Sequence, residues 1–245
     1  RMVALVQEVG RSIDEIYRAD FDEEEILSDE EVVQPTDESL QRLAKVAENR
    51  PDSSARIDED IPLEDAARRP LYRYKRAKTL YKLLRARLEF QRADDSTATE
   101  KAQLSYLLDT EEGRRALNTA LRSQKKRHVG SSMMNITTCG AIPPYNPVLG
   151  GKLAGLLMVS PQVISDYQEK YGGTTSYIAS RMKGAPLERR NQLVLLETTS
   201  LYSVGSSQYN RLRAPVANGE VRYNEIGLTD GYGSVHLSER TYRSV

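Results

Sequence analysis

The stretch that decides the fold begins with Thr137-Thr138-Cys139-Gly140-Ala141-Ile142-Pro143-Pro144-Tyr145-Asn146-Pro147. It continues through Gly150-Gly151-Lys152 into an apolar run, and it closes with Thr198-Thr199-Ser200-Leu201-Tyr202 and Gly205-Ser206-Ser207-Gln208-Tyr209-Asn210-Arg211. The prolines fix φ and hold their neighbours extended, so residues 141–149 cannot be helical. The pattern predicts a strand over 129–138, a proline-rich turn, an apolar helix over 150–167 with a possible break at Ser160-Pro161, a strand over 193–199 and a short helix over 206–212. Later strands are expected at 221–223 and 235–237, which makes the fold class α+β.

Helical periodicity dominates the chain before this stretch. Apolar residues recur at intervals of three and four over 2–16, 39–49 and 71–92, which predicts three amphipathic helices. A fourth helix is expected over 110–126, because Thr110 is a suitable N-cap and acidic residues follow it directly.

Length and composition place the chain among globular proteins. Its 245 residues suffice for one large domain, or for a domain with an extension, and a start at Arg1 indicates a fragment of a longer chain. The single cysteine excludes an internal disulfide and fits a reducing, cytoplasmic location. No apolar run reaches the roughly 18 residues of a membrane span, so we expect no membrane partner.

A net charge of zero conceals two regions of opposite sign. Residues 1–65 carry 20 acidic and 7 basic side chains, whereas residues 66–245 carry 15 acidic and 28 basic ones. We therefore expect an acidic N-terminal region of helices and loops over 1–65 and a basic α+β domain over 66–245. A solvated acidic linker is the alternative for the first region.

The expected helix over 71–92 and the end of the helix over 110–126 are strongly basic. This pattern is typical of a face that binds nucleic-acid phosphates. The alternative is a solvated helix whose cations pair with the acidic region. The candidate nucleic-acid-binding residues are Arg73, Lys75, Arg76, Lys78, Lys82, Lys125, Lys126 and Arg127.

The charge division suggests that the acidic region competes with nucleic acid for the basic domain. A tethered segment acts at an effective concentration of about a millimolar, and its field is screened by salt. On this hypothesis, deletion of residues 1–65 tightens nucleic-acid binding at low salt.

Polar residues at two turns form a second candidate site, for an anionic ligand at the start of the expected helix over 150–167. It is not a P-loop, because Asn146 and Leu153 stand where that motif needs Gly and Ser or Thr. Ordinary turn and capping chemistry is the alternative. The candidate ligand-binding residues are Tyr145, Asn146, Gly150, Gly151, Lys152, Ser206, Ser207, Gln208, Tyr209, Asn210 and Arg211.

Two residues are candidates for catalysis. Cys139 is a possible nucleophile with His128 or His236 as its base, although a lone cysteine is more often a small buried hydrophobe. Glu197 lies in an otherwise apolar strand, where a carboxylate needs a special environment. With two histidines and one cysteine, the chain offers no zinc-ligand cluster.

Several phrases resemble the DruA family of the bacterial Druantia anti-phage defence system. They are Cys139–Asn146, Leu149–Leu153, Ile178–Met182, Thr198–Arg211 and Tyr232–His236, and the resemblance extends from Leu71 to the C-terminus. It implies a role in antiviral defence, with other subunits of the system as possible partners. It implies neither a reaction nor a cofactor, so a non-catalytic assembly module is a further hypothesis.

The turn before residue 150 is also weakly similar to the acyl-coenzyme A loop of GCN5-related N-acetyltransferases. Only Gly150 matches the pattern of that loop, while Pro147 and Lys152 depart from it. This similarity implies an acetyltransferase-like mixed sheet flanked by helices. It also implies an alternative function, an enzyme that binds a nucleotide or acyl-CoA.

Overall fold

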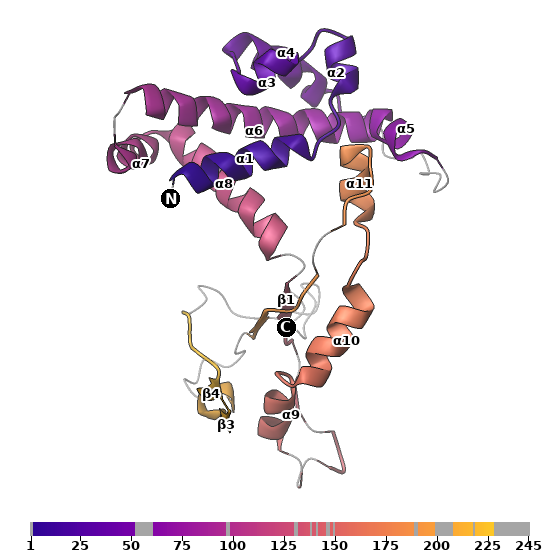
Figure 1. Cartoon of the computed structure of the whole chain (residues 1–245), viewed down its shortest axis with the longest axis vertical. Helices are drawn as coiled ribbons and strands as arrows, with labels where there is room; N and C mark the ends of the chain where they lie inside the picture. Colours follow the sequence, from indigo (N-terminus) through magenta and orange to yellow (C-terminus); the bar gives the residue numbers. More distant parts are fainter. Residues whose placement is uncertain are drawn as a thin grey trace, which may run out of the picture. The chain divides into compact units, whose positions relative to one another are not determined.

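The structure is a computed structural model, and it is mostly helical with two small sheets (Figure 1). It describes residues 2–51, 61–96, 99–129, 132–137, 139–140, 142–145, 148, 150–188, 191–198, 208–217 and 219–227. The described chain is therefore α+β. It divides into two compact units, residues 1–130 with 173–189 and residues 131–172 with 190–245, and these do not divide at the change of charge near residue 65.

The first unit is built around one long helix, α6, against which α1, α4 and α8 pack (Figure 1). The predicted helices over 2–16, 39–49, 71–92 and 110–126 all form, with boundaries shifted by a few residues. The short helices α2, α3, α5, α7 and α11 were not predicted. The elements of this unit are α1 (Met2–Asp14), α2 (Ala19–Glu23), α3 (Asp29–Val33), α4 (Asp37–Glu48), α5 (Leu63–Arg68), α6 (Pro70–Ser96), α7 (Glu100–Asp109), α8 (Glu111–His128) and α11 (Tyr177–Lys183).

Side-chain caps fix where several of these helices begin. Ser28 and Thr36 form capping boxes at the starts of α3 and α4. The hydroxyl of Thr110 accepts a hydrogen bond of 3.1 Å from the backbone N–H of Gly113, as expected for the N-cap of α8. Ser28, Glu31, Thr36 and Ser39 of the acidic N-terminal region thus have local structural roles.

The acidic N-terminal region contributes directly to the hydrophobic core. Val9, Ile13, Phe21 and Leu43 are at most 1% exposed and belong to the same core cluster as Leu84 of α6. The expectation of a displaceable acidic arm is therefore corrected: deletion of residues 1–65 removes part of the core of the first unit. The region is also not a solvated linker where the structure describes it.

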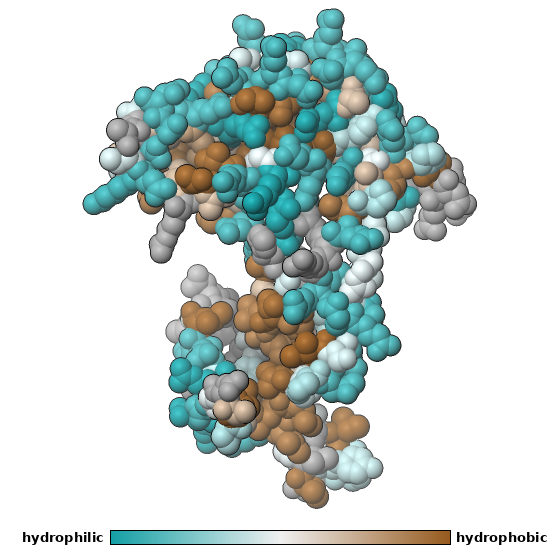
Figure 2. All heavy atoms as spheres, viewed as in Figure 1, coloured by the Kyte–Doolittle hydropathy of each residue, from teal (hydrophilic) through white to brown (hydrophobic). Residues whose placement is uncertain are grey.

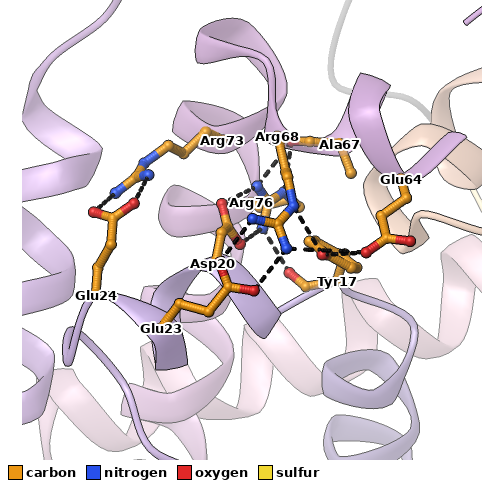
Figure 3. A network of polar contacts seen from close by, with 9 residues as sticks. All are labelled: Tyr17, Asp20, Glu23, Glu24, Glu64, Ala67, Arg68, Arg73 and Arg76. Atoms are coloured by element: carbon orange, nitrogen blue, oxygen red, sulfur yellow. Dashed lines mark hydrogen bonds and ion pairs between the residues drawn. The ribbon is translucent and has the colours of Figure 1, made fainter. Parts of the chain in front are cut away.

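Figure 3 shows the ion pairs that join the acidic helix α2 to α5 and α6. Arg76 is fully buried, and its two terminal nitrogens each donate a 2.7 Å hydrogen bond to one carboxylate oxygen of Asp20. Arg76 also donates to the backbone oxygens of Tyr17 and Ala67, at 2.7 Å and 2.8 Å. Around this pair lie two exposed pairs, Arg68 with Glu23 and Arg73 with Glu24.

Helix α11 comes from much later in the chain and docks beside the same network. The backbone N–H of Tyr17 donates a 2.9 Å hydrogen bond to the carbonyl of Met182. Gly184 ends α11 with φ of 72°, and a Cβ atom at this position would lie 2.9 Å from the Tyr17 ring. Both the backbone conformation and the close approach require glycine here.

The second unit contains β1 (Met133–Asn135), α9 (Gly151–Leu157), α10 (Pro161–Tyr171), β2 (Leu195–Glu197), the 3-10 helix η1 (Gln208–Arg211), β3 (Arg213–Val216) and β4 (Gly219–Arg222). β1 and β2 are parallel with Asn135 opposite Glu197, and β3 and β4 form an antiparallel hairpin. The expected order of strand, turn, helix, strand and short helix is present, and the expected helix over 150–167 is interrupted at Ser160-Pro161.

Packing in the second unit centres on Gly155 of α9. A Cβ atom there would lie 2.7 Å from the Leu212 side chain, so any residue larger than glycine at position 155 displaces the Leu212 side chain. The Tyr223 hydroxyl donates a 2.8 Å hydrogen bond to the Gly155 carbonyl, and the Tyr223 and Tyr209 ring centroids are 5.0 Å apart. Burial raises the pKa of Tyr223 above its usual value, and the nearby Tyr209 and Cys139 raise it further.

Some expectations remain open after this description. The described residues form only two-stranded sheets, so the larger acetyltransferase-like mixed sheet stays a prediction. The strand expected at 235–237 lies outside the described residues. In the described part of the chain, none of the helices combines the length and the apolar character needed to span a bilayer.

The buried pair yields a stability prediction. Asp20→Asn leaves the buried Arg76 charge without its counter-ion, so the free energy of unfolding of the first unit is expected to fall by about 3–5 kcal/mol. Denaturant unfolding followed by circular dichroism measures this change. Glu23→Gln is the matched control and leaves stability nearly unchanged, because its pair with Arg68 is exposed to solvent. Equal effects of the two variants would contradict a dominant role for the buried pair.

The hydrogen bond of Tyr223 yields a second prediction. Tyr223→Phe is expected to lower the free energy of local opening around α9 by about 0.5–1.5 kcal/mol at pH 7, as measured by amide hydrogen exchange. Because the pKa of Tyr223 is raised in the folded state, this residue's stabilisation is complete below the ordinary tyrosine pKa of about 10 and is lost as the pH rises above it. The gap between wild type and variant should therefore shrink at high pH. Tyr145→Phe, at an exposed tyrosine, is the control and leaves α9 protection unchanged.

Candidate nucleic-acid interface

The candidate nucleic-acid-binding arginines are engaged within the first unit. Arg73 pairs with Glu24, and Arg127 pairs with Glu8 and Glu15 at 2.7 Å and 2.8 Å. The hydrogen bonds that Glu24 accepts from Arg73 lower the pKa of Glu24 and keep this carboxylate charged. Arg76 has no exposed surface, which corrects the expectation that it contacts phosphate: a buried guanidinium bonded to Asp20 is not accessible to nucleic acid.

The candidate lysines behave differently from the arginines. Lys78 and Lys82 on α6 and Lys125 and Lys126 on α8 are exposed, and Lys75 on α6 is half-buried. None of the five lies within ion-pair distance of a carboxylate in the part of the chain that the structure describes. Their positive charge is therefore not neutralised by a local ion pair.

The lysines of α6 share one helix face with aromatic residues. Positions 74, 78, 81, 82 and 85 recur at intervals of three and four, so Tyr74, Lys78, Tyr81, Lys82 and Arg85 lie along one side of α6. Lys78 and Lys82 are exposed on this side, whereas Tyr81 is half-buried and packs against the core. Lys75 borders this face. We refer to these six residues as the lysine–tyrosine stripe.

Three cations of the stripe, Lys75, Lys78 and Arg85, lie beside phenol groups. Lys78 Nζ donates a 3.2 Å hydrogen bond to the Tyr74 hydroxyl, and Arg85 donates one of 2.9 Å to the Tyr81 hydroxyl. The second bond raises the pKa of Arg85. Glu112 of α8 lies 3.9 Å from Arg85, so a carboxylate limits the positive charge at this end of the stripe. At the other end, the ammonium of Lys75 lies 5.2 Å from the centre of the Tyr72 ring.

A shallow hollow of about 360 Å³ adjoins the stripe at Tyr74. It lies between the end of α4 and the start of α6, and the residues that line it are Lys45, Val46, Asn49, Pro70, Arg73 and Tyr74. Lys45 is exposed here, so the hollow extends the cationic and aromatic surface of the stripe.

The second candidate site, for an anionic ligand, is only partly described. Tyr145 and Lys152 are exposed, and the backbone before α9 is extended at Gly150 without a side-chain cap. Asn146, Ser206, Ser207 and the Gln208 side chain lie outside the described residues. Asn210 and Arg211 are exposed on η1, and Tyr209 packs against Gly155. The structure thus brings η1 to the middle of α9, at Gly155.

The surroundings of this second site are apolar. Leu153 and Leu157 of α9 and Ile164 of α10 are 42–56% exposed. Figure 2 shows hydrophobic residues gathered over this part of the second unit. Binding of an anion by the candidate residues stays a prediction.

The catalytic candidates Glu197 and Cys139 are both half-buried, and they lie beside different neighbours. The carbonyl of Glu197 in β2 accepts a 2.8 Å hydrogen bond from the backbone of Ile136, and Cys139 lies close enough to Tyr223 to affect its pKa. The His128 side chain and His236 lie outside the described residues, so no base for Cys139 is defined. Within the described ranges, no three His, Cys, Asp or Glu side chains are grouped to hold a metal ion.

Two features of the first unit were missed by sequence analysis. The hydrogen bonds that join Tyr74 to Lys78 and Tyr81 to Arg85 along α6 were not anticipated. Arg181 of α11 was not considered, although it lies in the phrase Ile178–Met182.

Comparisons with known proteins give one consistent result. The family model of the Druantia protein DruA matches residues 114–245. A curated relative, the Druantia protein DruA of Escherichia coli (strain UMEA 4076-1), is 36% identical over 112 residues, which are 45% of this chain and 25% of that protein. The match thus spans a quarter of the relative's length. No solved structure matches the chain. Because the family model covers more than half of its residues, this chain belongs to the DruA family.

Proposed function

We propose that this chain is a nucleic-acid-associated component of a Druantia-like bacterial defence system against phages, and that it contacts nucleic acid through the lysine–tyrosine stripe. The family supports the defence context. The observation that carries the contact is that Lys78 and Lys82 are exposed, Lys75 is half-buried, and none of the three pairs with a carboxylate among the described residues, whereas the neighbouring arginines are paired.

The chemistry of the stripe fits a nucleic-acid strand. Lysine ammonium groups bind phosphates by displacing condensed counterions, which gives affinity without sequence specificity. Interleaved tyrosines provide aromatic surfaces on which unpaired bases stack. Single-stranded nucleic acid is therefore the expected ligand, with the choice between DNA and RNA left to the binding assay.

Other parts of the proposal follow from the family and from composition. A cytoplasmic location fits the single cysteine and the presence of nucleic acid as target. Other subunits of the defence system are the expected protein partners, and co-purification with neighbouring gene products tests this. The nucleotide- or acyl-CoA-binding alternative depends on the turn at Gly150. The described geometry of that turn gives it no added support.

The stripe is tested by Lys78→Gln together with Lys82→Gln. Fluorescence anisotropy with single- and double-stranded DNA and RNA at low salt is expected to show weaker binding of every ligand that the wild type binds. Two lost phosphate contacts should also reduce the slope of log K against log salt by about 1.4 for a single strand. The weakening should be greatest at low salt.

Lys101→Gln together with Lys170→Gln is the matched control, because both lysines are exposed and lie on other helices. This variant removes the same charge and should retain wild-type affinity. The proposal fails if the wild type binds none of the ligands at low salt, or if the stripe variant and the control bind equally well.

A further inference from the structure

Arg181 is a buried cation for which the described residues supply no counter-ion. It is 2% exposed, and its Nε–H is buried without a hydrogen-bond partner. Among the residues that the structure describes, no carboxylate lies within ion-pair distance of its guanidinium. The same unit holds Arg76, equally buried, with a bidentate carboxylate and two backbone acceptors. The fold therefore satisfies one buried arginine fully and leaves the Nε–H of the other without a hydrogen-bond partner.

Such an arrangement is unfavourable without a ligand. Arginine stays protonated in proteins, so it cannot relieve burial by losing its charge. The Tyr177 ring, whose centroid is 3.4 Å from the guanidinium carbon, offers a cation–π contact. This contact and the position of Arg181 near the C-terminus of α11 offset only part of the desolvation. An anion bound at Arg181 would supply the missing partner.

The surroundings of Arg181 favour an anion. The charge of Arg181 acts on the buried hydroxyl of Tyr72, opposing the rise in pKa that burial causes there. Lys75 places its ammonium over the same Tyr72 ring. Two cations and two phenols thus gather where α11 meets α6. The planar fork of arginine, with its paired N–H donors, matches two oxygens of a phosphate.

We infer that Arg181 and Lys75 form a phosphate-binding site at the contact of α11 with α6, and that its ligand is a phosphate group of a nucleic-acid strand. The Tyr177 ring lies against the guanidinium and is 47% exposed, so a change of the Tyr177 side-chain rotamer opens the site. Lys75 belongs to both this site and the stripe, so a strand that follows α6 brings its backbone to Arg181. The source of the phosphate rests on the proposed function, whereas the phosphate site itself does not.

Thermal unfolding with inorganic phosphate tests the site at constant ionic strength, with chloride as reference. Phosphate at about ten times its Kd is expected to raise the Tm of the wild-type chain by about 3–5 °C. Arg181→Met should abolish this shift without lowering the Tm of the unliganded protein, because it removes an unpaired buried charge. Arg122→Met, at an exposed arginine of α8, is the charge-matched control and keeps the full shift.

A second variant keeps the test decisive if Arg181→Met does not fold. Lys75→Gln changes a half-buried side chain and should weaken phosphate affinity several-fold. The phosphate site is overturned if the wild type shows no shift, or if both variants respond like the control. The stripe variant with Lys78 and Lys82 replaced should keep the phosphate shift, which separates failure of this site from failure of the stripe.

The source of the phosphate is tested with a single-stranded oligonucleotide and a nucleoside 5′-monophosphate. Arg181→Met is expected to weaken oligonucleotide binding about tenfold relative to Arg122→Met, since it removes a charge-assisted bidentate contact. Unchanged oligonucleotide affinity, together with a lost response to phosphate and to the monophosphate, would overturn the strand as the source and assign the site to a small phosphorylated ligand.

Discussion

The buried ion pair between Asp20 and Arg76 constrains most of the first unit. A guanidinium can lie inside a core only where its donors meet acceptors, and Arg76 meets this requirement with five hydrogen bonds that it donates to Asp20, Tyr17 and Ala67. These acceptors come from the loop before α2, from α2 itself and from α5. The acidic region must therefore fold against α6 in the same chain, and its apolar residues complete the core that the pair helps to align.

The first unit uses its two kinds of cation differently. Arginines hold the acidic helices in place, since a planar fork binds a carboxylate at two points even when partly desolvated. Lysines of α6 and α8 lie on the solvated side, where a strongly hydrated ammonium loses little. Zero net charge is thus compatible with a cationic face, because the cation in each ion pair between described residues is an arginine, and the lysines of this face take no part in them.

Sequence periodicity predicted the long helices well and the polar contacts poorly. The helices around Val9, Leu43, Leu84 and Thr110 were recognisable because apolar spacing and caps are local signals. The charge division indicated attraction between the two regions, but it could not distinguish the buried Arg76 from the exposed Lys78 two positions later. That difference arises from tertiary packing on both sides of α6.

Short elements and long-range contacts explain the remaining differences. Helices such as α7 and α11 contain too few turns for a clear period, and the hairpin of β3 and β4 contains a proline. The convergence of Arg181, Tyr72 and Lys75 joins segments far apart in the chain, which no local pattern reports. In the second unit, the expected sequence of elements is present, but the candidate residues at 206 and 207 fall outside the described part.

The docking of α11 on Tyr17 has a consequence for the order of synthesis. Residues 131–172 are inserted between two parts of the first unit, so α1 to α8 leave the ribosome before the helix that completes them. Domains generally begin to fold as they emerge, and the early helices already share a core. The backbone N–H of Tyr17 and the surface of α5 gain their contacts only after Met182 and the left-handed turn at Gly184 have been synthesised. The family model matches from residue 114 onward, whereas the first unit contains residues on both sides of this position. The start of the family match is thus not a boundary of the folding unit.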